Sequence, residues 1–257
     1  MNKFIYFNLQ TVKKKYFASD FHLGYPTKEL SREREKKLVR WLDSIKDDAE
    51  EIYLMGDIFD FWYEYKWVVP RGFVRFIGKL AEIADSGIPI YIFTGNHDVW
   101  FKDYFPKEVG VILSNQAVVK EWNGKTFYLH HGHALGKYDR GMNFLDWVFT
   151  NRFLQFCFSR IHPNGAFGFA HFWSKKSREA KVYEAKTFLG EDKEKLFLFA
   201  KDVLQNEHYD YFVFGHRHLA LNMPIGKSSR IINLGNWISR STYGVWDGEN
   251  FELKEFS

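Results

Sequence analysis

The sequence contains a single cysteine, Cys157, so no disulfide can form within the chain, as is typical of proteins in a reducing compartment. No run approaches the roughly 18 apolar residues that a membrane-spanning helix needs. Residues 1–19 lack an apolar run that ends in a small-residue cleavage site. The sequence also shows no internal repeat and no low-complexity tract. We therefore expect a cytoplasmic protein whose contact with a membrane is at most peripheral.

Aromatic residues are more abundant than a core of this size needs. The chain has 257 residues, of which 46% are hydrophobic and 26% charged, close to globular averages, but Phe, Tyr and Trp make up 19%. Some of these rings are therefore expected to meet a ligand or a membrane. The formal charge of +4 and the pI of about 8.9 suit anionic partners such as phosphates, nucleic acid or acidic lipids, and alone select none of them.

The order of predicted elements indicates one α/β domain over residues 1–257. Strands and helices alternate at first, and a hairpin then turns at Asn123-Gly124, a pair that favours positive φ. The pattern is helical from about 135 to 207, with a break at residues 162–165, and strands return from Tyr211. A helical lid insertion is expected at about 135–190. The predicted strands and helices of the first half are Tyr16–Ser19, 28–46, Glu51–Met55, 71–85, Ile88–Thr94, Ala117–Lys120 and Thr126–His131.

Five polar segments directly follow predicted strands. Because the ends of neighbouring strands converge in α/β folds, these segments are expected to meet in one crevice. A lone Asp-x-His is common by chance, but five such segments in this order are not. The segments are Asp20-Phe21-His22, Gly56-Asp57-Ile58-Phe59-Asp60, Gly95-Asn96-His97-Asp98, His131-Gly132-His133 and Gly215-His216-Arg217-His218.

The side chains of these segments suit a pair of divalent metal ions. Carboxylates, imidazoles and one amide oxygen favour Mn²⁺, Fe²⁺ or Zn²⁺ over a thiolate site or a calcium cage. A single tetrahedral ion would be oversupplied, whereas two ions that share Asp57 use every ligand. In the extended pairs Asp20/His22 and His216/His218, both side chains should point to the same side. The candidate ligands are Asp20, His22, Asp57, Asn96, His131, His216 and His218.

These motifs resemble the calcineurin-like metallophosphoesterase superfamily, whose ordered signature is D-x-H, G-D-x-x-D, G-N-H-[DE], H and G-H-x-H. The resemblance implies a four-layer α/β/β/α sandwich with a dinuclear metal centre at the strand ends. It assigns Asp20, His22, Asp57 and His218 to one metal, and Asp57, Asn96, His131 and His216 to the other. His130 precedes His131, and only one of the two can be the ligand.

His97 is the candidate to stabilise the transition state or to protonate the leaving oxygen, with Asp98 placed to orient it. Such a histidine can also be purely structural. A catalytically silent scaffold with this fold remains an alternative of another class, although scaffolds should lose ligands and none is lost here.

The predicted insertion indicates an amphiphilic substrate. Residues 144–173 contain ten aromatic residues, and a basic stretch with Lys175, Arg178 and Lys181 follows. Acyl chains could lie among the rings while the cations hold phosphate oxygens, and the rim could rest on an anionic bilayer. The ordinary alternative is a helix core beside a solvated face.

Three further elements resemble the UDP-2,3-diacylglucosamine hydrolases of lipid A biosynthesis: Thr94–Trp100, His162-Pro163 and Trp173–Arg178. The resemblance implies Mn²⁺-dependent hydrolysis of the pyrophosphate to UMP and 2,3-diacylglucosamine 1-phosphate, at the cytoplasmic face of the inner membrane. A soluble phosphodiesterase acting on nucleotides or nucleic acid is the alternative, because His-Gly-His, here residues 131–133, also occurs in nucleotide-cleaving relatives. No nucleic-acid partner is expected from the preferred interpretation. The candidate substrate contacts are Lys175, Ser177, Arg178, Lys181 and Arg140.

Overall fold

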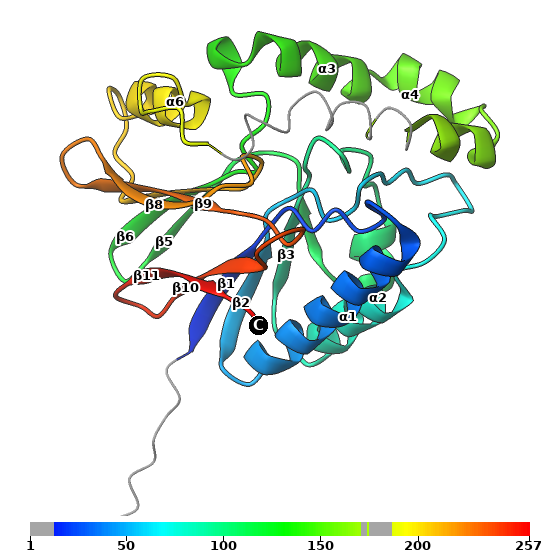
Figure 1. Cartoon of the computed structure of the whole chain (residues 1–257), viewed down its shortest axis with the longest axis horizontal. Coiled ribbons are helices and arrows are strands. Elements are labelled where there is room, and N and C mark those ends of the chain that lie inside the picture. The colour runs from blue at the N-terminus through cyan, green and yellow to red at the C-terminus, as the bar shows by residue number, and fades with distance from the viewer. Residues whose placement is uncertain (1–12, 171–173, 175–186) are drawn as a thin grey trace, which may run out of the picture.

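Two β-sheets that pack face to face form the centre of the molecule (Figure 1). The computed structural model describes residues 13–170, 174 and 187–257. The first sheet has the order β11-β10-β1-β2-β3-β4, and the second has the order β5-β6-β7-β9-β8. The strands of the first sheet are β1 (Lys14–Ala18), β2 (Ala49–Leu54), β3 (Ile90–Phe93), β4 (Ile112–Ser114), β10 (Thr242–Trp246) and β11 (Phe251–Glu255). Those of the second are β5 (Val118–Trp122), β6 (Lys125–Leu129), β7 (Tyr211–Phe214), β8 (Ala220–Ile225) and β9 (Ser229–Leu234).

Successive side chains of the central strands point to opposite faces of the sheet and belong to two separate hydrophobic cores. In β1, Phe17 points into the layer between the sheets, while its neighbours Tyr16 and Ala18 point to the opposite face. In β2, Tyr53 joins the inner layer, and Ile52 lies on the outer face. Because both faces are buried there, the last three residues of each strand, Tyr16–Ala18 and Ile52–Leu54, are all apolar.

Helices cover the outer face of each sheet, which completes four layers. The helices α1 (Lys28–Ile45) and α2 (Val74–Asp85) cover the first sheet, and α6 (Lys195–Val203) covers the second (Figure 1). α1 begins at Thr27, whose side chain accepts a hydrogen bond from the backbone N–H of Leu30 at 3.3 Å. The predicted α/β/β/α sandwich is confirmed.

A group of helices lies between β6 and β7 in the chain and runs across the top of the view in Figure 1. It contains the short η2 (Gly136–Tyr138), α3 (Arg140–Thr150), α4 (Arg152–Ser159) and a helical stretch at 163–170. Asn151 separates α3 from α4, because its side chain caps α4 by accepting from the N–H groups of Phe153 and Leu154. The full extent of the lid stays a prediction, since residues 171–173 and 175–186 lie outside the described part.

The structure corrects three details of the predicted organisation. Residues 187–194 form turns and bends rather than a helix. α6 packs on the second sheet, outside the predicted lid at about 135–190. The short strand β4 and the π-helical turn η1 (Phe105–Val109) were not predicted. The hairpin is confirmed, with Asn123 and Gly124 at φ of 51° and 72°. Among the described residues, no helix has the length and apolarity needed to cross a membrane.

Candidate metal centre

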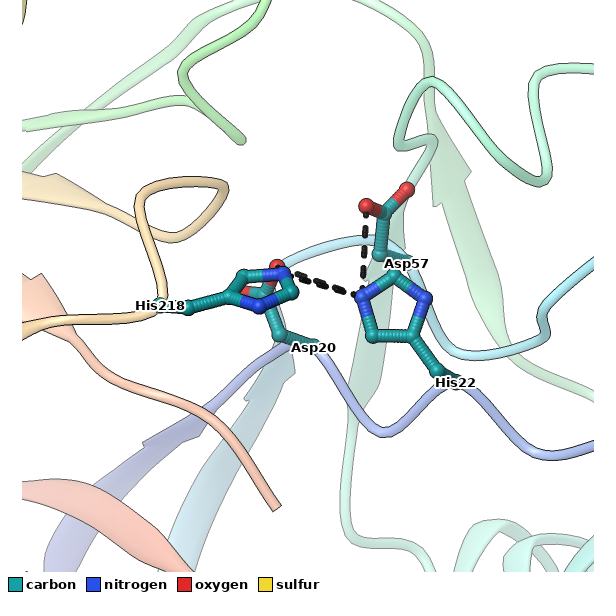
Figure 2. A group of neighbouring side chains, drawn as sticks. All are labelled: Asp20, His22, Asp57 and His218. Carbon is teal, nitrogen blue, oxygen red and sulfur yellow. Dashed lines mark hydrogen bonds and ion pairs between the residues drawn. The ribbon is translucent and has the colours of Figure 1, made fainter. Parts of the chain in front are cut away.

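The loops that follow β1, β2 and β7 bring four candidate ligands together. Figure 2 shows the side chains of Asp20, His22, Asp57 and His218 pointing toward one another. One ligand atom from each lies within 4.8 Å of the others. Asp57 also belongs to a second group of the same kind, with His131 and His216. Asp57 therefore stands between two clusters, the position that a bridging carboxylate needs.

In the first cluster, hydrogen bonds fix the carboxylate of Asp20 through the oxygen that faces away from the other ligands. Oδ2 of Asp20 accepts from the hydroxyl of Ser19 at 2.5 Å and from the backbone N–H of His216 at 3.0 Å. Oδ1 is thereby turned toward the imidazoles, 3.0 Å from Nε2 of His218 and 3.8 Å from Nε2 of His22. These outer contacts orient the ligand atoms before any ion is bound.

The second cluster is fixed in the same way. Oδ1 of Asp57 accepts from the backbone N–H of His97 at 2.9 Å, so Oδ2 faces the centre. Nδ1 of His131 lies 2.6 Å from the carbonyl oxygen of Met55. Because a carbonyl only accepts, Nδ1 donates to it, and Nε2, 3.5 Å from Oδ2 of Asp57, faces the centre. A histidine held by a backbone carbonyl in this manner is the usual form of a metal ligand.

Five of the seven candidate ligands have left-handed backbone conformations, which residues other than glycine rarely adopt. The φ angles are 57° at Asp20, 44° at His22, 51° at Asp57, 64° at His216 and 58° at His218. The expectation of extended pairs is therefore wrong in its geometry, because β1 ends at Ala18 and β7 at Phe214. The side chains converge through tight turns instead, and backbone strain of this kind concentrates at functional sites.

Two glycines allow the loops to approach each other. A Cβ on Gly95 would lie 2.1 Å from Oδ1 of Asp57, and one on Gly215 would lie 2.7 Å from Oδ2 of Asp20. Neither glycine has a positive φ, so each is required for close approach rather than for its own conformation.

The donor set fits divalent cations. Oδ1 of Asn96 and Nε2 of His131 are buried and have no hydrogen-bond partner among the described residues. Buried polar atoms without partners are costly, and a cation that binds them removes this cost. Asn96 lies between Gly95 and His97, both of which contact Asp57. All seven predicted ligands thus belong to loops that meet at the same end of the two sheets.

The charges of the site also favour cations. Burial raises the pKa of Asp57, but the electrostatic influence of the neighbouring His131, His97 and His22 outweighs it and holds that pKa well below the usual range. Burial and the charge of His131 lower the pKa of His216, which is therefore neutral, the form that binds metals. Burial lowers the pKa of His131 as well, yet the carboxylate of Asp57 raises it to about 9.

His97 is positioned by Asp60 rather than by Asp98. Nδ1 of His97 lies 3.0 Å from the carbonyl oxygen of Asp60 and 4.0 Å from its carboxylate, and the ring stands edge-on to His22. The Asp60 carboxylate also accepts from the hydroxyl of Ser174 at 3.0 Å, so one residue of the predicted lid reaches the site. Asp60 and Ser174 were not among the predicted site residues, although the G-D-x-x-D motif contains Asp60.

Asp98 joins two loops of the site. Its buried carboxylate accepts from the backbone N–H groups of Gly95 at 2.7 Å, Ile58 at 2.6 Å and Phe59 at 3.2 Å. Burial and the charge of Asp57 raise the pKa of Asp98 to about 7. The expected role of orienting His97 is replaced by that of an anchor between the loops after β2 and β3.

Arg34 is a further residue that the sequence did not reveal. It is buried in α1, and its guanidinium donates to the carbonyl oxygens of Phe21, His22, Tyr25 and Trp237 at 2.8 to 3.2 Å. These bonds hold the loop that carries His22. An arginine in an otherwise amphipathic helix gives no sequence signal for such a role.

The predicted substrate contacts are placed only in part. Lys175, Ser177, Arg178 and Lys181 lie outside the described residues. Arg140 is exposed at the start of α3. These five assignments stay predictions.

Comparison with known proteins agrees with the geometry. A family model described as calcineurin-like phosphoesterase matches residues 14–220. The chain belongs to the calcineurin-like phosphoesterase family. Members of this family are hydrolytic enzymes that use divalent metals, so the clusters around Asp57 are the candidate active site of a hydrolase.

Several curated relatives of this family member share one name. A UDP-2,3-diacylglucosamine hydrolase from Porphyromonas gingivalis is 38% identical over 255 residues, which cover 94% of this chain and 97% of the relative. Proteins of the same name from Vibrio atlanticus and Aeromonas hydrophila are each 25% identical. The match to the Vibrio protein covers 95% of this chain and 98% of that protein. The match to the Aeromonas protein covers 88% of this chain and 91% of that protein.

Proposed function

We propose that this phosphoesterase hydrolyses UDP-2,3-diacylglucosamine to UMP and 2,3-diacylglucosamine 1-phosphate. The observation that carries the proposal is the 38% identity, over nearly both full lengths, to a relative that bears this name. The apolar surface of the lid helices supports an acylated substrate.

Asp20, His22, Asp57 and His218 would hold one divalent ion, and Asp57, Asn96, His131 and His216 the other. When bound, paired cations ionise water near neutral pH and neutralise phosphoryl oxygens in the transition state. Mn²⁺ is the proposed metal, since mixed carboxylate, imidazole and amide ligands suit it, and Fe²⁺ or Zn²⁺ would also fit.

His97 is the proposed proton donor to the leaving oxygen. Its Nδ1 is held by the Asp60 carbonyl, so its Nε2 is free of that contact and can serve the substrate. Water adds to the uridylyl phosphorus, the bond between this phosphorus and the bridging oxygen breaks, and that oxygen departs as part of the sugar phosphate. His97 is 19% exposed in its side chain, which leaves it accessible to a bound substrate.

The lid is proposed to hold the acyl chains and to rest on the cytoplasmic face of the inner membrane. Large aromatic side chains are exposed on its helices, among them Phe144, Trp147, Phe153, Phe156 and Phe169. Several large exposed apolar side chains on one group of helices are typical of binding or membrane surfaces. Lys175, Ser177, Arg178, Lys181 and Arg140 are the proposed contacts with the polar part of the substrate.

The test is hydrolysis of UDP-2,3-diacylglucosamine in H₂¹⁸O by the Mn²⁺-loaded protein, with Asp57→Asn as the inactive control. The expected result is label in UMP only. UDP-N-acetylglucosamine, which lacks the acyl chains, serves as the comparison substrate. Equal rates on the two substrates would favour a soluble nucleotide phosphodiesterase, and a metal-loaded protein without any hydrolytic activity would favour a scaffold.

A further inference from the structure

A polar cavity of about 330 Å³ lies beside the candidate metal centre, between the lid helices and the body of the protein. Its walls come from four parts of the chain: the loop after β3, Asn115 after β4, the loop after β6, and the helices α3 and α4. Eight of the twelve lining residues have polar side chains, while Trp100 and Phe101 add an apolar wall.

His133 forms the boundary between the cavity and the metal centre. It lines the cavity, and its ring centroid lies 5.3 Å from that of His131 and 6.4 Å from that of His216. The side chain is 8% exposed, and Nε2 lies 3.6 Å from the carboxylate of Asp146 in α3. Nδ1 is buried without a hydrogen-bond partner in the described part of the chain. A buried polar atom without a partner indicates a place where a ligand supplies one.

α3 separates the polar cavity from the apolar surface of the lid. Asp146 and Thr150, one turn apart, line the cavity. Phe144 and Trp147 of the same helix are 63% and 58% exposed. An amphiphilic substrate would therefore have separate places for its two ends. The cavity is at the small end of ligand pockets, which span about 300–1,000 Å³, and its polar lining does not suit acyl chains.

We propose that this cavity binds the uridine of a UDP-linked substrate, an inference that rests on the function proposed above. Trp100 and Phe101 offer apolar contact to a flat base, and the amide of Asn115 can both donate to and accept from the imide edge of uracil. Binding there places the uridylyl phosphoryl group on the His131 side. The acylated sugar phosphate then departs on the His22 side, where the ring of His97 lies 4.9 Å from that of His22.

The test compares the affinity of UMP with that of ribose 5-phosphate, which lacks the base, by calorimetry on the metal-loaded protein. We expect UMP to bind at least about tenfold more tightly. Asn115→Trp, which fills the cavity from its rim, should abolish this difference. Gln116→Trp is the matched control, because Gln116 is the neighbouring exposed amide and does not line the cavity; it should keep the difference.

Thermal unfolding and metal content establish that each variant is folded. If Asn115→Trp does not fold, Thr150→Phe, which fills the cavity from α3, takes its place in the comparison of UMP with ribose 5-phosphate. Equal affinities for UMP and ribose 5-phosphate in the unmodified protein would overturn the cavity assignment, even if UDP-2,3-diacylglucosamine were hydrolysed. Tighter binding of UMP than of ribose 5-phosphate, lost in both cavity variants, would support the cavity assignment. If UDP-2,3-diacylglucosamine were then not hydrolysed, only the proposed function would fail.

Discussion

Gly95→Ala should inactivate the enzyme by moving its central carboxylate. The added Cβ would lie 2.1 Å from Oδ1 and 2.3 Å from the backbone nitrogen of Asp57, whereas ordinary contact begins at 3.4 Å. Asp57 or the loop that carries Asn96 must therefore move by about 1 Å, and a misplacement of this size at a reacting centre costs about 100-fold in rate. We expect kcat/KM to fall about 100-fold, which corresponds to about 2.7 kcal/mol of transition-state stabilisation.

Gly78→Ala is the matched control. Gly78 lies in α2, and a Cβ there would meet no atom within 4 Å. This variant should keep its activity and gain about 0.8 kcal/mol in the free energy of unfolding, because alanine is the better helix former. The assay is hydrolysis of bis(p-nitrophenyl) phosphate by the Mn²⁺-loaded proteins, with metal content measured in parallel. A Gly95→Ala protein with both metals and ordinary turnover would refute the reasoning.

Four other perturbations test separate parts of the site. His97→Gln should lower kcat by about 10²–10⁴-fold with the metals in place, and near-normal turnover would remove His97 from the mechanism. Asp98→Ala leaves three buried N–H groups unpaired and should lower the free energy of unfolding by about 3 kcal/mol in a denaturant titration; a loss below about 0.5 kcal/mol would argue against the anchor. Chelation by EDTA should abolish hydrolysis and added Mn²⁺ should restore it, whereas activity that survives dialysis against EDTA would speak against a metal enzyme. The double variant Phe144→Ser/Trp147→Ser should sediment less with anionic vesicles, whereas Val119→Ser on β5 should not; equal sedimentation of the two proteins would count against lid contact with membranes.

Sequence patterns predicted the central strands and the loops that carry the candidate ligands, because both leave strong local signals. β1 and β2 each end in three apolar residues, and a polar motif begins within two residues of each strand end. β4 was missed because it has only three residues and all are partly or fully exposed, so no apolar run marks it. The predicted helical pattern continued past the lid to about residue 207, and the structure shows that its last helix, α6, packs against the second sheet.

Side-chain direction was the part that the sequence could not supply. Asp98 is adjacent to His97 and was expected to orient it, yet its carboxylate points to the backbone of Ile58, about forty residues earlier in the chain. Contacts such as Ser174 with Asp60, separated by 114 residues, depend on where the lid folds over the body. Neither the contact of Asp98 with Ile58 nor that of Ser174 with Asp60 produces a periodic pattern in the sequence.

Anomalous diffraction at the manganese edge, from crystals grown with Mn²⁺, tests the dinuclear centre most directly. We expect two peaks on either side of Asp57, one among Asp20, His22 and His218 and the other among Asn96, His131 and His216. A single peak, or peaks that Asp57 does not contact, would contradict a centre in which this carboxylate joins two ions.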